Sequence, residues 1–318
     1  MKALAHSARS LGDRGPGTGY RERTALLLAA GLLIGACATA PQAAKKEENM
    51  PKLEREAVLV PVAADPTISF AIAFAVGSQN DPAGKEGLAY LTATLMAEGA
   101  TASHSYADIL KALYPMAAGY TVRVDKERVT FSGRVHRDNL DAYGALLLDA
   151  VLRPAFAEDD FLRVQQRTVD YLEKSLRYAS DEDLGKAALY NTVFAGTPYG
   201  HINQGTVAGL KAITLDDVRA FHRSRFVRGA VTLGLGGGYP AGLPGTVAAQ
   251  LAALPAGTPE RVAAPSPAPP AGRSVVIVAK PGQSTAISFG FPISVRRGER
   301  EFYALWLANS WLGEHRNS

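Results

Sequence analysis

Two apolar runs open the regular part of the chain. Residues Ala57–Val62 and Thr67–Val76 are rich in β-branched and aromatic side chains, and Asp65-Pro66 separates them, a pattern typical of paired strands. A polar, Gly-rich loop follows and leads into an apolar helix at Gly87–Glu98. Periodicity then predicts a helix at 105–116, a hairpin of strands 120–124 and 128–135, helices at 138–152, 158–178, 183–194 and 214–225, and a strand at 230–235. The last of these helices starts with a near capping box, Thr214 with Asp217. Strand pairs followed by helices predict an α+β fold.

The opening of the chain recurs 219 residues later. Ile68-Ser-Phe-Ala-Ile is echoed by Ile287-Ser-Phe-Gly-Phe, each after a short apolar strand and before a polar loop and an apolar helix. This order indicates a duplication. We therefore expect a duplicated antiparallel-rich sheet with helices on one face and a truncated second copy. The predicted organisation is a leader at 1–37, a tether at 38–55, a first domain at 56–240, a Pro/Ala-rich linker at 241–273 and the start of a second domain at 274–318.

The N-terminal segment resembles a bacterial lipoprotein leader. A basic segment precedes an apolar run at 24–36 that is too short to span a bilayer. Ile34-Gly35-Ala36-Cys37 resembles a lipobox, in which Cys37 would be lipidated and become the mature N-terminus. A plain signal peptide with an incidental cysteine is the alternative. An acyl anchor, with Ala38 after the cysteine, predicts an outer-membrane lipoprotein that faces the periplasm; a soluble periplasmic or secreted protein is the alternative.

The net charge of the chain gives little information about its function. The chain has a formal net charge of +4, but its first 36 residues hold five basic and two acidic residues, which leaves 29 basic and 28 acidic residues. No basic stripe follows, so we expect no nucleic-acid partner. The one cysteine excludes an intrachain disulfide.

The loop and helix at 76–89 carry a family resemblance. Val76-Gly-Ser-Gln-Asn-Asp-Pro-Ala-Gly-Lys-Glu-Gly-Leu-Ala is similar to the strand, loop and helix start of insulinase/pitrilysin-type zinc metallopeptidases, which include mitochondrial processing peptidase. In that family the helix continues into His-x-x-Glu-His. Two histidines four apart share one helix face and bind zinc, and the Glu activates the bound water. The resemblance extends over 57–318 and implies a processing-peptidase-like fold.

The metal-binding positions hold no ligands here. Tyr90 stands at the first His place, Ala93 at the base and Thr94 at the second His place. A phenol with a pKa of ~10 and a Thr hydroxyl are poor ligands at neutral pH, and Ala is no base. Glu173 falls at the family's third-ligand place, counted back from Pro198-Tyr199-Gly200, although it also fits a solvated helix residue. We therefore predict no metal, no cofactor and no catalytic residue.

Other patterns offer no replacement site. No two of the six histidines lie four apart, and His201 and His222 are expected in turns or on the surface. Gly234-Leu-Gly-Gly-Gly-Tyr lacks the third glycine of a dinucleotide loop, because Tyr239 stands there.

The resemblance implies a function. We expect a catalytically inactive homologue that forms a peptide chamber with an active insulinase-family peptidase, so that it is at most a subunit of a zinc metalloendopeptidase. In bacterial two-chain relatives the silent subunit supplies an Arg/Tyr pair, which would lie past Ser318. A stand-alone peptide-binding or envelope-assembly lipoprotein is the alternative. An active zinc peptidase would require stoichiometric zinc in the pure protein.

Overall fold

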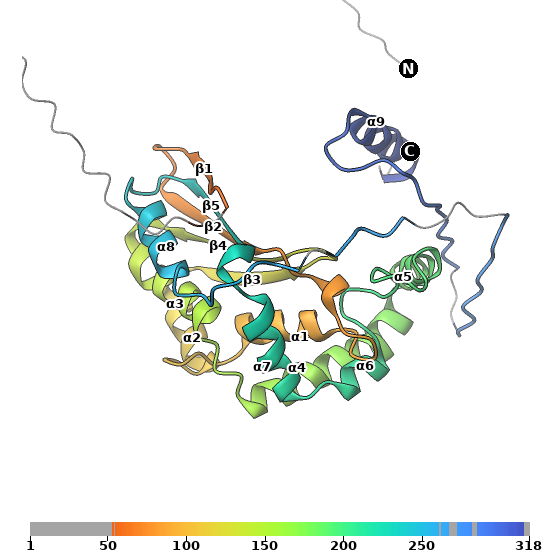
Figure 1. Ribbon diagram of the computed structural model, residues 1–318, viewed down its shortest axis with the longest axis horizontal. Helices are drawn as coiled ribbons and strands as arrows, with labels where there is room; N and C mark the ends of the chain where they lie inside the picture. Colours follow the sequence, from red (N-terminus) through yellow and green to blue (C-terminus); the bar gives the residue numbers. More distant parts are fainter. Residues whose placement is uncertain (1–52, 54, 261, 267–271, 282–284, 315–318) are drawn as a thin grey trace, which may run out of the picture. The chain divides into compact units, whose positions relative to one another are not determined.

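A computed structural model describes residues 53, 55–260, 262–266, 272–281 and 285–314, which all lie in one compact unit, 48–318 (Figure 1). The predicted leader with Cys37 and most of the predicted tether lie outside the described residues. Among the helices of the described part, none is long and apolar enough to cross a membrane.

A five-stranded sheet forms the centre of the fold, with the strand order β1-β5-β2-β4-β3. In β2 the residues Ile68, Phe70, Ile72 and Phe74 are all buried and alternate with partly exposed residues, so one face of the strand meets the core. The edge strand β1 pairs with β5 in parallel, and the other neighbours are antiparallel. The bounds are β1 Val58–Pro61, β2 Thr67–Phe74, β3 Gly119–Val124, β4 Val129–His136 and β5 Val231–Gly237.

Helices α1, α4 and α7 lie together on one side of the sheet (Figure 1). Helix α1 is the most deeply buried of the three, with nine of its eleven residues in the core. The α-helices are α1 Leu88–Glu98, α2 Tyr106–Leu113, α3 Leu140–Leu152, α4 Glu158–Asp170, α5 Asp181–Val193, α6 Val207–Ala212, α7 Leu215–Arg225, α8 Leu243–Leu251 and α9 Arg300–Asn309. The expected α+β class, with helices packed on one face of a sheet, is confirmed.

Several elements differ from the sequence-based expectation. The long helix expected at 158–178 ends its α-helical part at Asp170 and continues as a π-helical segment, η4 (Tyr171–Ala179). Helix α8 lies inside the stretch expected to be a linker. Pro244 suits the first turn of this helix, and Val247 and Leu251, four residues apart, are buried in the core.

The described residues after the linker form no strand, although two strands were expected at 275–279 and 287–291. Ile277, Ile287 and Phe289 are mostly exposed. These expectations were wrong for the described residues, because a strand needs a hydrogen-bonded neighbour and none of the described strands pairs with this segment. The apolar helix expected at 302–312 is present as α9, followed by a π-helical turn, η6 (Ser310–Glu314).

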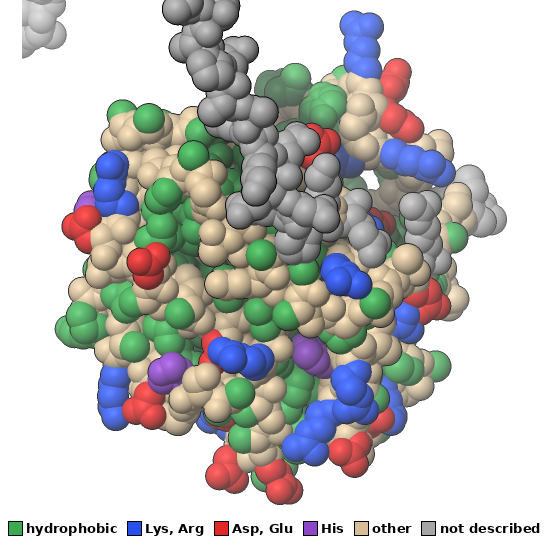
Figure 2. Space-filling model, turned by 60° about the vertical axis from the view of Figure 1, so that its left-hand side comes forward, with side chains coloured by type: hydrophobic (Ala, Val, Ile, Leu, Met, Phe, Trp, Pro, Cys, Tyr) green, Lys and Arg blue, Asp and Glu red, His purple; other side chains and the backbone are tan. Residues whose placement is uncertain are grey.

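Acidic and basic side chains are interspersed on the face of the molecule shown in Figure 2. Such a face does not build the one-sided positive field that binds nucleic acid.

Candidate functional site

Helix α1 carries the three positions that correspond to the metal-binding motif. Ala93 is fully buried, Thr94 is almost fully buried and Tyr90 is half-buried. A side-chain hydrogen bond joins Tyr90 to Thr94, one helical turn apart. Burial raises the pKa of the Tyr90 phenol, which keeps its proton at neutral pH. The structure thus brings these residues together as a neutral, hydrogen-bonded pair.

An ion pair lies beside Tyr90. Arg167 Nη1 on α4 is 2.6 Å from Glu98 Oε2 at the end of α1. The charges of Arg167 and Glu98 both influence the pKa of the Tyr90 phenol electrostatically. Tyr171, at the start of η4, also interacts electrostatically with this phenol. The Arg167–Glu98 ion pair therefore bridges helices α1 and α4 beside Tyr90.

Glu173 has a different partner. Its carboxylate accepts a hydrogen bond from Lys211 Nζ on α6 at 3.1 Å, and both side chains are substantially exposed. Tyr171, two residues earlier on η4, interacts electrostatically with the Tyr90 phenol. The printed side-chain contact of Glu173 is thus with α6, and its assignment to the third-ligand place stays a prediction.

The residues at these positions do not fit a zinc ion. They offer a protonated phenol, a methyl group and a hydroxyl group, whereas a catalytic zinc site uses about three His, Cys or carboxylate ligands. Within the described ranges, no group of three or more His, Cys, Asp or Glu residues could hold a metal ion.

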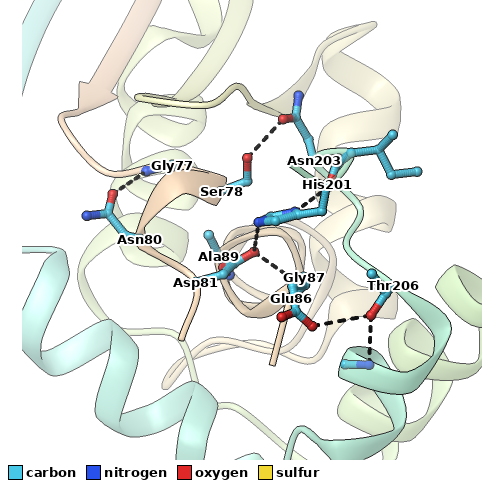
Figure 3. Close-up of polar contacts among 12 residues, drawn as sticks. Gly77, Ser78, Asn80, Asp81, Glu86, Gly87, Ala89, His201, Asn203 and Thr206 are labelled. Carbon is cyan, nitrogen blue, oxygen red and sulfur yellow. Dashed lines mark hydrogen bonds and ion pairs between the residues drawn. The ribbon is translucent and has the colours of Figure 1, made fainter. Parts of the chain in front are cut away.

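A buried polar cluster holds the start of α1 (Figure 3). Asp81 Oδ2 accepts the Gly87 N–H and Oδ1 accepts the Ala89 N–H, both at 2.7 Å. The Asp81 side chain has no exposed surface, and His201 Nε2 is 3.9 Å from Oδ2. A carboxylate is well placed there, because the first N–H groups of a helix have no partner within the helix.

Two further loops join this cluster. Lys126, at the turn between β3 and β4, donates to the backbone oxygen of His201, and burial lowers the pKa of Lys126 to about 8. Ser78 Oγ donates to Asn203 Oδ1 at 3.0 Å. Loops far apart in the sequence thus fix the position of α1.

Sequence reasoning missed this cluster. It read Asp81 as loop chemistry and expected His201 in a turn or on the surface, but His201 is buried. An acidic residue shortly before a Gly-led apolar helix was the one available signal. His222, on α7, is also largely buried, between the rings of Phe156 and Phe226.

The cluster predicts an unusual pH dependence of stability. Burial raises the pKa of Asp81 to about 7, against 3.8 for the ordinary carboxyl group. Because the folded-state pKa is the higher one, Asp81 favours folding fully at low pH and progressively less as pH rises from about 4 to 7. Glu86 and Lys126 face the same carboxyl group. His201 acts in the opposite direction, because burial lowers its pKa and its protonation below pH ~6.5 opposes folding.

The difference in unfolding free energy between the wild type and Asp81→Asn separates the contribution of Asp81 from that of His201. Urea unfolding at a series of pH values should show the wild type losing up to about 1.4 kcal/mol per pH unit relative to the variant between pH ~4 and 7. Asp216→Asn is the control, because the Asp216 side chain is 93% exposed. A difference that does not change with pH would contradict the raised pKa.

Comparisons with known proteins agree with this fold. The family model described as insulinase (peptidase family M16) matches residues 57–205, and the one described as peptidase M16 inactive domain matches 212–318. No curated protein sequence matches the chain significantly.

Solved structures show the same relationship. A peptidase M16 inactive domain from Pseudomonas fluorescens is similar with a TM-score of 0.60 and 25% identity, over 67% of this chain and 51% of that one. A protease from Helicobacter pylori matches with a TM-score of 0.56 and 18% identity, over 69% and 54%. Pitrilysin matches with 0.54 and 17%, over 64% and 22%. The chain spans about half the length of the first two structures.

The five-stranded sheet with helices packed on one face, a fold shared with these solved peptidase structures, defines a peptidase-like protein. The two family-model matches and the structural similarity show that the chain belongs to the insulinase (M16) peptidase family.

Proposed function

We propose that this chain is a non-catalytic subunit that forms a peptide chamber together with an active zinc peptidase of the same family. The observation that carries the proposal is the α1 face, where Tyr90, Ala93 and Thr94 replace two ligands and a base. The helix that carries this face is held firmly in place. Asp81 caps α1, and the Arg167–Glu98 pair joins α1 to α4. A well-anchored helix without metal-binding side chains suits a structural and substrate-binding role.

The companion should be recognisable and stable. Tagged full-length protein, purified from the cells that make it, should bring down an equimolar second chain that contains an intact His-x-x-Glu-His motif. The complex should cleave unfolded peptides, and a zinc chelator should abolish this cleavage. The isolated chain should cleave none, because its motif positions supply neither a metal ligand nor a base.

Two outcomes would contradict the proposal. Chelator-sensitive cleavage by the isolated chain would show that it is itself a peptidase. A chain that remains monomeric beside its motif-bearing relative, and that binds peptide alone, would favour a stand-alone peptide-binding or envelope-assembly lipoprotein.

The location is part of the proposal. A lipid on Cys37 would tether the chain at the outer membrane, facing the periplasm, where it could meet peptide substrates. Labelled palmitate should enter the wild-type protein and not Cys37→Ser. Equal labelling of both would exclude this anchor.

A further inference from the structure

A cavity of about 760 Å³ opens between the β3–β4 turn, α5 and the loop at 199–204. This volume is in the range of ligand pockets. Tyr171 is one of the residues that line the cavity, and its phenol interacts electrostatically with the phenol of Tyr90. Tyr171 thus connects the cavity with the α1 position that the proposed function concerns through one electrostatic interaction.

Positive charge exceeds negative charge along its wall. Five cationic side chains line the cavity, against three carboxylates. The cations are Arg123, Lys126, Arg128, Lys186 and Arg297, and the carboxylates are Asp125, Glu127 and Asp183.

Several of these charged groups already have partners. Asp125 Oδ1 is 3.2 Å from Arg123 Nε, Lys186 Nζ is 2.5 Å from Glu182 Oε1, and Glu127 accepts a hydrogen bond from the Tyr199 hydroxyl. Among the described residues, by contrast, the Arg128 guanidinium has neither a hydrogen bond nor an ion pair. Its planar donors are available to a ligand carboxylate, which they can bind in a bidentate manner.

Aromatic rings supply the apolar part of the wall. Tyr190 stacks on Phe194 with ring centroids 5.0 Å apart, and the Lys126 ammonium lies 5.7 Å from the Tyr190 ring centroid. Tyrosine offers both apolar contact and a polar tip, which suits the mixed surface of a peptide.

We propose that this cavity binds acidic peptide segments, an inference that rests on the proposed function and specifies its substrate class. Ligand carboxylates would pair with the unpartnered Arg128 and with the excess positive charge, while apolar side chains would lie on the tyrosine rings. Basic segments are disfavoured, because like charges would meet across the cavity.

Paired peptides test the charge preference directly. A labelled peptide with several glutamates, and the same peptide with lysines in their place, are titrated with full-length protein and followed by fluorescence anisotropy. We expect the acidic peptide to bind roughly tenfold more tightly, equivalent to about 1.4 kcal/mol. Added salt should reduce the difference, because exposed charges are screened.

The preference should depend on one arginine. Arg128→Glu should lower the acidic-to-basic affinity ratio by roughly tenfold, since it removes one attraction and adds one repulsion. Lys111→Glu is the matched control, because Lys111 lies on α2, outside the cavity, with a side chain 78% exposed. Its ratio should equal that of the wild type.

Equal affinities for the two peptides, no binding of either, or an unchanged ratio in Arg128→Glu would overturn the proposal. None of these results would affect the subunit role, which depends on the companion chain. Conversely, a chain that has no companion but prefers acidic peptides would keep the cavity assignment and refute the subunit role.

Discussion

Tyr90→His and Thr94→His together, with Tyr171→Glu as a third change, are expected to raise the zinc affinity of this protein from negligible to stoichiometric. Positions 90 and 94 are one helical turn apart, and a hydrogen bond already joins their side chains. Two histidines there would share one ion. The Tyr171 phenol on η4 interacts electrostatically with that of Tyr90, and we therefore expect a carboxylate at position 171 to serve as the third ligand.

The third ligand can be identified by adding one of two further substitutions to the double variant Tyr90→His/Thr94→His. Adding Tyr171→Glu to the double variant should tighten zinc binding by at least about tenfold, or about 1.4 kcal/mol, measured by calorimetry and metal analysis. Adding Glu173→Ala should leave the affinity unchanged, because Glu173 pairs with Lys211. If Glu173→Ala weakens binding and Tyr171→Glu has no effect, Glu173 is the third-ligand position, as the count along the sequence indicated.

Zinc should also stabilise the triple variant. A metal that binds only the folded state raises its melting temperature with increasing metal concentration. The wild-type protein provides the baseline for this measurement.

Gly205→Ala should cause the largest loss of stability among single substitutions in the loops around α1. Gly205 has a φ of +89°, and a Cβ there would lie 2.0 Å from the Glu86 carbonyl oxygen and 2.5 Å from Gly87 Cα. Neither neighbour can move easily, because both are backbone atoms at the start of α1. Strain and overpacking together should cost about 3 kcal/mol or more of unfolding free energy, measured by urea denaturation.

A second glycine isolates the steric part of this cost. Gly84 also has a positive φ, +79°, but a Cβ there would meet nothing within 4 Å. Gly84→Ala should therefore lose only the conformational part, about 1 kcal/mol. Equal losses of unfolding free energy in Gly205→Ala and Gly84→Ala would show that the predicted steric clash at Gly205 costs little stability.

Local patterns predicted much of the fold. The apolar, β-branched run at Thr67–Val76 predicted the strand β2, and the capping box of Thr214 with Asp217 is present at the start of α7. Both depend on residues close in sequence, which propensity and periodicity describe well. The helix around Val247 was not predicted, because burial of Val247 and Leu251 against distant segments stabilises it. The π-helical continuation at Tyr171 was not predicted either.

The sequence by itself determined the α+β class, the family resemblance and the identities of the residues at positions 90, 93 and 94, because each depends on residue identities at fixed spacings. Only the tertiary structure decided that Asp81 is buried against His201, that the Tyr171 and Tyr90 phenols interact electrostatically while Glu173 pairs with Lys211, and that cations from three segments line one cavity. These arrangements join residues tens of positions apart, and no local propensity specifies such pairs. Burial then changes the chemistry of the groups it brings together, as the raised pKa of Asp81 shows.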